Sequence, residues 1–162
     1  FEPAQTLAWI QQAFGPRPKS RQARPRLYTI DPVQDGERSV TIRRSGGTPS
    51  ATLGYHAPPA AHPDFAAVEL LSMVLTEPPA GRLHKRLVEE LRSAASVSGY
   101  AVPLAEPGAL LLGADTQPGG DAQALSVELI REAESLAAKP ITQAELERAR
   151  TRFIDRRSER AS

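Results

Sequence analysis

The chain has 162 residues, of which 40% are hydrophobic and 24% are charged, and its formal net charge is +1 at pH 7. These values predict a single domain over residues 1–162 that buries its own core, and they exclude a wholly disordered or collagen-like chain. The absence of cysteine excludes disulfides, thiolate zinc sites and cysteine nucleophiles. No apolar run is long enough to span a membrane, and the near-zero net charge gives no general attraction to nucleic acid. The chain opens at Phe1 without a targeting signal, which predicts that it is cut from a longer polypeptide.

The first expected elements are a helix and a basic loop. Apolar residues at helical spacing predict a helix over Pro3–Phe14, with its proline in the first turn. Residues 15–26 are rich in proline and basic residues and contain no acid, which predicts a linker or an exposed loop. An anion-binding arm is the alternative, but the segment has no aromatic side chain to stack on bases.

Three strands are expected next. Leu27–Ile30 is a short candidate, and Ser39–Arg44 and Ser50–Ala57 alternate apolar and polar residues on either side of Gly46-Gly47. Two alternating runs around a glycine turn predict a hairpin. In the later strand one face is expected to carry the apolar side chains, namely Ala51, Leu53, Tyr55 and Ala57.

The second half of the chain repeats strands and helices. A broadly apolar helix is expected over Asp64–Leu75, buried between layers. After the Pro78–Gly81 break another helix is expected from Arg82, with Leu83, Leu87 and Leu91 along one face. Strands follow over 95–104 and 109–115, and then a helix capped by Asp121 that runs to about 138. The capping box Thr142–Glu145, flanked by a hydrophobic staple of Ile141 and Leu146, opens the last helix. This helix is expected to fray past Ile154 unless a part missing from this chain packs on it.

This order of elements predicts an α+β fold. Strands come in hairpin-like pairs and helices in pairs, which favours a two-layer, mostly antiparallel sheet with paired helices packed on one face.

No catalytic, cofactor-binding or metal-binding residue is predicted. The three histidines, His56, His62 and His84, do not form a helical His-x-x-x-His pair. Glu89 is the only acid close to His84 in sequence, and on an α-helix it points about 140° away from it. The histidines are therefore interpreted as unrelated surface or capping groups. Nucleophile-elbow, dinucleotide and P-loop patterns are absent.

A family resemblance is carried by fragments along nearly the whole chain. They are Gly36-Glu37-Arg38-Ser39-Val40, Leu53-Gly54-Tyr55-His56-Ala57-Pro58, His62-Pro63-Asp64, Gly81-Arg82-Leu83-His84-Lys85, Leu87-Val88-Glu89, Glu106-Pro107-Gly108, Pro140-Ile141-Thr142 and Glu145-Leu146. Together they resemble the pitrilysin/insulinase family of zinc metallopeptidases, in the non-catalytic domain that follows the zinc-binding domain. The same fold occurs in mitochondrial-processing-peptidase-like half domains.

The resemblance implies that chemistry lies elsewhere in the parent protein. Family members hold zinc on an inverted His-x-x-Glu-His helix plus a distal Glu in the first domain, and two halves close around a peptide substrate. The zinc polarises the scissile carbonyl and the Glu acts as general base. This chain has no such motif, so the expected cofactor here is none, with zinc in the preceding domain. The expected partners are that domain, a second clamshell half and the parent's peptide substrate, without nucleic acid or membrane insertion.

One difference from the family pattern indicates which half of the clamshell the chain belongs to. The family's substrate-gripping domain carries an Arg and a Tyr at positions that correspond here to Val88 and Ala95, while Arg92 and Tyr100 lie too far along. This favours the second domain of the catalytic half, with a degenerate partner half as the alternative.

The resemblance therefore implies a scaffold domain of a bacterial zinc endopeptidase, inactive by itself. The alternative from another class is a catalytically dead homologue that serves as an assembly subunit. A third reading, a nucleic-acid or anion binder that uses the basic residues of 17–26 and 148–160, is weakened by the acids among the second group. Nothing in the sequence fixes the compartment, and the family analogy is compatible with a periplasmic parent.

Overall fold

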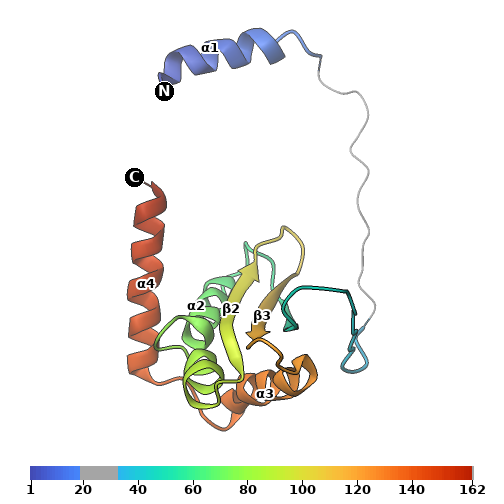
Figure 1. The fold of residues 1–162 in the computed structure, drawn as a ribbon. Helices are drawn as coiled ribbons and strands as arrows, with labels where there is room; N and C mark the ends of the chain where they lie inside the picture. The colour runs from blue at the N-terminus through green and yellow to red at the C-terminus, as the bar shows by residue number, and fades with distance from the viewer. Residues whose placement is uncertain (19–32, 162) are drawn as a thin grey trace. The chain divides into compact units, whose positions relative to one another are not determined.

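The computed structural model describes residues 1–18 and 33–161, and side chains as far as residue 159 (Figure 1). The chain divides into two compact units, Phe1–Ile42 and Arg43–Ser162. The strand predicted over Leu27–Ile30 and most of the loop predicted over 15–26 lie outside the described residues.

The described residues of the first unit form one helix. Helix α1 spans Pro3–Phe14, as predicted, with proline in its first turn and Gly15 directly after it. None of its residues is buried.

The strand predicted over Ser39–Arg44 is wrong, and so is its hairpin with Ser50–Ala57. Residues 39–44 have no regular secondary structure, and the side chains of Val40 and Ile42 are 84% and 73% exposed. Alternation of apolar and polar residues shows only that a segment would suit a half-buried strand. To form a strand, the segment also needs a neighbouring strand for its backbone hydrogen bonds. The strand over Ser50–Ala57 finds its partner more than 50 residues later instead.

The second unit is built on a three-stranded antiparallel sheet. Its strands are β1 (Ser50–Ala57), β2 (Ala94–Val102) and β3 (Gly108–Thr116), in the order β1-β3-β2. Leu112 of the central strand lies opposite Leu53 on one side and Gly99 on the other. The predicted apolar face of β1 is confirmed, since Ala51 and Ala57 are buried and the residues between them alternate between exposed and half-buried.

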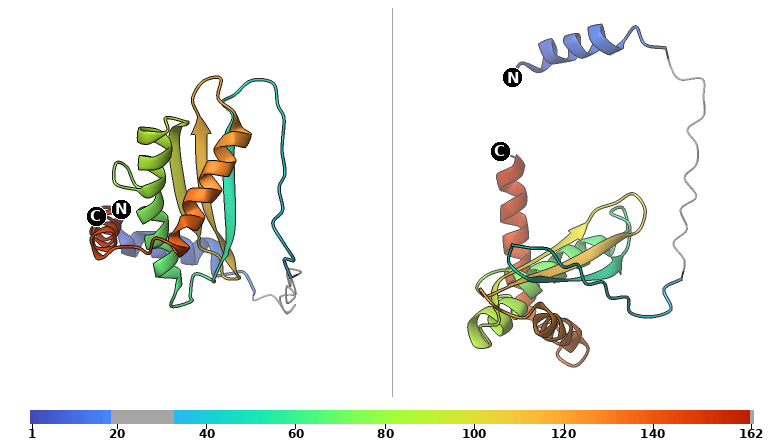
Figure 2. Two further views of the ribbon diagram at one scale, coloured as in Figure 1. Left: turned by 90° about the horizontal axis from the view of Figure 1, so that it is seen from below. Right: turned by 45° about the vertical axis from the view of Figure 1, so that its right-hand side comes forward.

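Helices cover one face of this sheet (Figure 2). Helix α2 (Phe65–Thr76) contacts β2 and β3, and helix α3 (Ala122–Glu134), followed by the 3-10 turn η2 (Ser135–Ala137), contacts β1 and β3. The leucines of this core that are at most 2% exposed are Leu75, Leu83, Leu87, Leu112, Leu125 and Leu129. The predicted two-layer α+β fold is confirmed, and the other face of the sheet is left open within this unit.

The helix predicted from Arg82 is a π-helix over most of its length. This element, η1, spans His84–Glu90, and the amide of Leu91 donates to the carbonyl of Arg86, five residues back, at 3.0 Å. Leu83 and Leu87 are fully buried, as their spacing predicted. Leu91 is 40% exposed instead, and it stands after the last residue of η1, at the C-cap.

Helix α4 (Gln143–Ala161) packs on α2. Its predicted capping box is present: the Glu145 amide donates to Thr142 Oγ1 at 3.3 Å, and the Thr142 amide donates to Glu145 Oε2 at 2.8 Å. The predicted fraying past Ile154 is wrong, since the helix continues to Ala161. The Arg156 guanidinium donates to Glu77 Oε2 at 2.6 Å, and the Arg157 guanidinium lies 5.3 Å from the Phe153 ring, so ion-pair and cation–π contacts support that last segment. None of the described helices combines the length and the apolar character that crossing a membrane would require.

A glycine in β2 allows α2 to approach the sheet closely. A Cβ atom at Gly99 would lie 2.7 Å from Thr76 Cγ2 and 3.1 Å from Leu112 Cδ2. We expect Gly99→Val to lower the free energy of unfolding by about 1–3 kcal/mol, because the larger side chain forces the two layers apart. Ser98→Val, next to it but on the open face, is the matched control and should stay within about 0.5 kcal/mol. Equal losses in urea unfolding would show that the two layers are not in this close contact.

Candidate functional site

The densest polar junction in the described residues joins the start of η1 to the start of α4. The Arg82 guanidinium donates to both oxygens of Glu145, with Nε–Oε1 at 2.7 Å and Nη2–Oε2 at 2.8 Å. It also donates to the carbonyls of Lys139 and Pro140, at 2.6 and 2.9 Å. The two charged side chains are only 14% and 17% exposed. We call this set the Arg82 junction; it fixes the turn before α4, because one charged donor holds two carbonyls of the loop that follows η2.

The junction shifts the pKa of both of its charged groups. The hydrogen bonds from Arg82, together with those from Thr142, lower the pKa of Glu145 to about 2, against a smaller opposing effect of burial. The hydrogen bond to Glu145 raises the pKa of Arg82. The pair therefore stays ionised throughout the range in which ordinary carboxyl groups take up protons.

This shift predicts a pH dependence of stability. The folded-state pKa of Glu145 lies below its ordinary value of 4.5, so the stabilisation is fully present above about pH 5 and is lost as the pH falls from 4.5 towards 2. The difference in unfolding free energy between the wild type and Glu145→Gln should narrow over that window in urea titrations. The same narrowing should appear for Arg82→Ala. A constant difference from pH 6 down to pH 3 would show that the pair does not form in solution.

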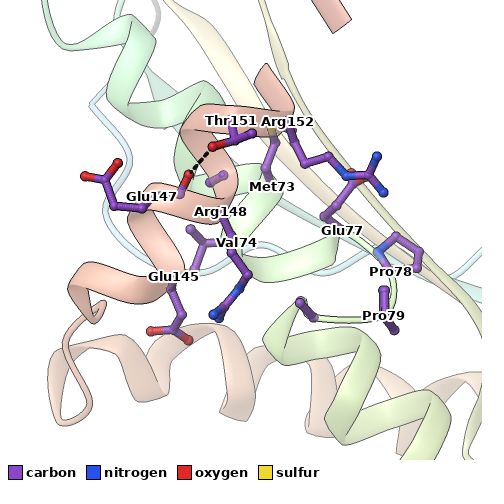
Figure 3. A pocket seen from close by; sticks show the side chains of 13 residues that line it. Met73, Val74, Glu77, Pro78, Pro79, Glu145, Glu147, Arg148, Thr151 and Arg152 are labelled. Carbon is purple, nitrogen blue, oxygen red and sulfur yellow. Dashed lines mark hydrogen bonds and ion pairs between the residues drawn. The ribbon is translucent and has the colours of Figure 1, made fainter. Parts of the chain in front are cut away.

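An apolar groove of about 580 Å³ lies beside the junction, between the end of α2 and α4 (Figure 3). Its floor is apolar and its rim is charged, with the lining residues Met73, Val74, Glu77, Pro78, Pro79, Ala80, Gly81, Glu145, Glu147, Arg148, Ala149, Thr151 and Arg152. Glu77 and Arg152 lie together at one rim, with 3.9 Å between Oε1 and Nε. No titratable side chain at this rim is aligned with a nucleophile, so the groove has the form of a contact surface and lacks the arrangement of a catalytic centre.

The three histidines lie on separate elements. His56 is exposed on β1, on the open face of the sheet, and His62 stands in the turn before α2, where its Nδ1 accepts the Asp64 amide at 3.1 Å. His84 opens η1. Over residues 1–18 and 33–159, no three or more histidine, aspartate or glutamate side chains gather closely enough to hold a metal ion.

The expectation that Glu89 points away from His84 is wrong. Glu89 Oε1 lies 3.4 Å from His84 Nδ1. On an α-helix these positions diverge by about 140°, but the π-helix brings residues five apart onto nearly the same side. This gives one imidazole–carboxylate pair on the first turn of η1.

Four residues were compared above with the substrate-gripping Arg and Tyr of the family. The structure places these four residues in different environments. Val88 is half-buried and packs against the core, and Ala95 is exposed in β2 beside the bulge at Ala94/Ser96. Arg92 sits in the turn after η1 with a φ of 50°. Tyr100 is 58% exposed on the open face of the sheet.

The Arg82 junction was missed from the sequence. Glu145 was interpreted only as the acid of a capping box, and nothing in the local pattern indicates that an arginine 63 residues earlier reaches it. The sequence does hold one signal for this contact: an arginine stands directly after a Pro-Pro-Ala-Gly break. At such a helix start, a long guanidinium side chain can reach a neighbouring element.

Comparison with known proteins identifies the family. The sequence profile of the peptidase M16 inactive domain matches residues 1–153. A curated zinc protease, PqqE of Helicobacter pylori, is 32% identical over 125 residues, which are 76% of this chain and 28% of that protein. The chain thus spans under a third of the length of that relative.

Two solved structures share the fold. The inactive peptidase domain of a zinc protease from Bordetella parapertussis is 38% identical, with a TM-score of 0.63 over 74% of this chain and 65% of that one. A protease from Helicobacter pylori is 27% identical, with a TM-score of 0.84 over 100% of this chain and 40% of that one. These matches confirm the resemblance drawn from the sequence motifs. The chain belongs to the M16 peptidase family, as an inactive domain of the zinc protease type.

Proposed function

We propose that this chain is a non-catalytic scaffold domain of a bacterial zinc endopeptidase and forms part of the wall of the chamber in which the parent protein hydrolyses peptides. The observation that carries this is the match of nearly the whole chain to an inactive peptidase domain. The separation of the three histidines supports it.

Zinc chemistry belongs, in this proposal, to the domain that precedes the chain. A catalytic zinc needs about three protein ligands and an open position for water, and the described residues of this chain do not assemble such a set. When bound in the preceding domain, zinc polarises the scissile carbonyl and activates water. The residues of this chain position that domain, together with a second clamshell half, around the substrate.

The open face of the sheet is the wall that the peptide meets. The helical face is filled by the core, whereas the open face presents short polar side chains such as Ser98 and Thr52 with Tyr100 standing among them. Short side chains let an extended peptide approach, and an exposed tyrosine gives it an amphipathic contact.

The proposal is tested by reconstitution. The parent's zinc-binding domain, expressed separately, is assayed with a fluorogenic peptide with and without this chain. Addition of the chain should raise kcat/KM by about tenfold or more, equivalent to about 1.4 kcal/mol of transition-state stabilisation. Equal activity with and without the chain would contradict a scaffold role, and so would association without any activity at all, which would favour a dead assembly subunit.

A matched pair of variants tests whether the peptide meets the open face of the sheet or the helical face. Tyr100 on the open face and Val127 on α3 are 58% and 55% exposed, so both tolerate replacement. Tyr100→Glu in the reconstituted enzyme should raise KM, and Val127→Glu should leave it unchanged. The reverse result would place the substrate on the helical side.

A further inference from the structure

Among residues 1–18 and 33–42, the described part of its unit, nothing covers helix α1. It has 12 residues and none of them is charged or buried. Its large apolar side chains Leu7, Trp9, Ile10 and Phe14 are between 49% and 65% exposed. A helix this short is marginal in water without packing, and a contiguous exposed apolar surface marks a contact site.

The apolar side chains lie on two sides of the helix. At 100° per residue, Leu7, Ile10 and Phe14 fall within about 60° of one another, while Trp9 lies about 130° from the centre of that stripe. Only the sector around Ala8 is free of large apolar groups. A helix with this pattern fits into a groove, since a flat surface would cover only one of the two sides.

We propose that α1 is a docking helix that inserts into an apolar groove on the parent's zinc-binding domain; this inference rests on the proposed function. The Helicobacter pylori protease matches 100% of this chain, which includes α1, although this chain accounts for only 40% of that protein. The matched region of that protein therefore includes the counterpart of α1, while more than half of that protein lies outside the match. In this proposal the corresponding remainder of the parent supplies the cover.

The composition of α1 favours a permanent protein contact over other occupants. The buried cores of protein interfaces are depleted in charge and enriched in aromatic residues, as this uncharged helix with Trp9 and Phe14 is. Helices that lie on membranes carry Lys or Arg on their polar face, whereas the polar residues of α1 are Gln and Thr.

Trp9 provides a direct reporter, because it is the single tryptophan of the chain. The whole chain is labelled with 5-fluorotryptophan, so that its ¹⁹F spectrum contains one resonance, and unlabelled zinc-binding domain is added. We expect the resonance to shift on addition and to become protected from broadening by a soluble gadolinium chelate.

Two aspartate variants, two residues apart on different sides of the helix, separate docking from a general loss of helix. Ile10→Asp places a charge in the apolar stripe and should weaken association by about 30-fold or more, as loss of an interface anchor does. Ala8→Asp costs more helix propensity than Ile10→Asp, because alanine is the better helix former, but it lies in the free sector. It should change the affinity by less than about threefold, so a larger loss in Ile10→Asp cannot come from a weaker helix.

Several outcomes overturn the inference. A Trp9 resonance that is already protected in the isolated chain, or that becomes protected only as the chain's own concentration rises, would assign the contact to this chain or to a second copy. Equal affinities of Ile10→Asp and Ala8→Asp would show that α1 does not dock. In either case, a tenfold activation of the zinc-binding domain by the chain would still support the proposed scaffold function. Absence of activation would contradict that function, whatever the Trp9 resonance shows.

Discussion

Leu112→Ala is expected to lower the free energy of unfolding by about 2–5 kcal/mol. Leu112 is fully buried on the central strand β3, between Leu53 and Gly99 of its neighbours and under the helical layer. The strands on both sides hold the backbone in place, so the cavity left by truncation does not collapse and its cost adds to the lost transfer energy of the side chain. Chemical denaturation followed by circular dichroism measures the change.

Leu111→Ala is the matched control for this prediction. It removes the same atoms from the next residue of the same strand, but its side chain is half-buried on the open face of the sheet. The loss should be below about 1.5 kcal/mol. If Leu111→Ala cost as much as Leu112→Ala, the open face would be covered within this chain, and it would not be available as a chamber wall.

Arg82→Ala is expected to cost about 1.5–3 kcal/mol of stability, because it breaks charge-assisted hydrogen bonds to a carboxylate that is 17% exposed and leaves the carbonyls of Lys139 and Pro140 without their donor. Arg82→Lys keeps the charge but loses the planar fork that reaches four oxygens, so it should recover only part of the loss. Urea unfolding at pH 7 compares the three proteins.

Arg86→Ala, four residues along, serves as the control. Arg86 pairs with Glu90 on the surface, where the side chains are 36% and 59% exposed, and exposed pairs contribute little. Its loss should be clearly smaller than that of Arg82→Ala. A full recovery by Arg82→Lys, or equal losses at the two arginines, would show that the Arg82 junction does not hold α4 in place.

The parts of the fold that were predicted from the sequence are those with local signals. Alternation fixed the inward face of β1, and the Thr142–Glu145 box located the start of α4 to within one residue. Asp121 caps α3 as expected, with its carboxylate accepting the Gln123 amide at 2.8 Å. In each case the determinant lies within a few residues of the element that it controls.

The parts that were missed depend on partners far along the chain or on an unusual backbone. The alternation of Val40 and Ile42 predicts a strand, but β1 pairs with β3 instead. The pairing of His84 with Glu89 needs a π-helix, which no local residue pattern distinguishes from an α-helix. The Arg82 junction spans 63 residues. For the function, the motifs identified the family, while the absence of a metal motif indicated which kind of domain this is.

Zinc titration of the isolated chain by calorimetry, with a peptide-cleavage assay on the same sample, tests the central claim most directly. A non-catalytic domain whose histidines lie on β1, the turn before α2 and η1 should show no site of submicromolar affinity and no cleavage above the buffer rate. A one-to-one zinc site of that affinity that disappears in His56→Ala or His84→Ala, together with cleavage of the peptide, would make this chain itself the enzyme and would contradict the account.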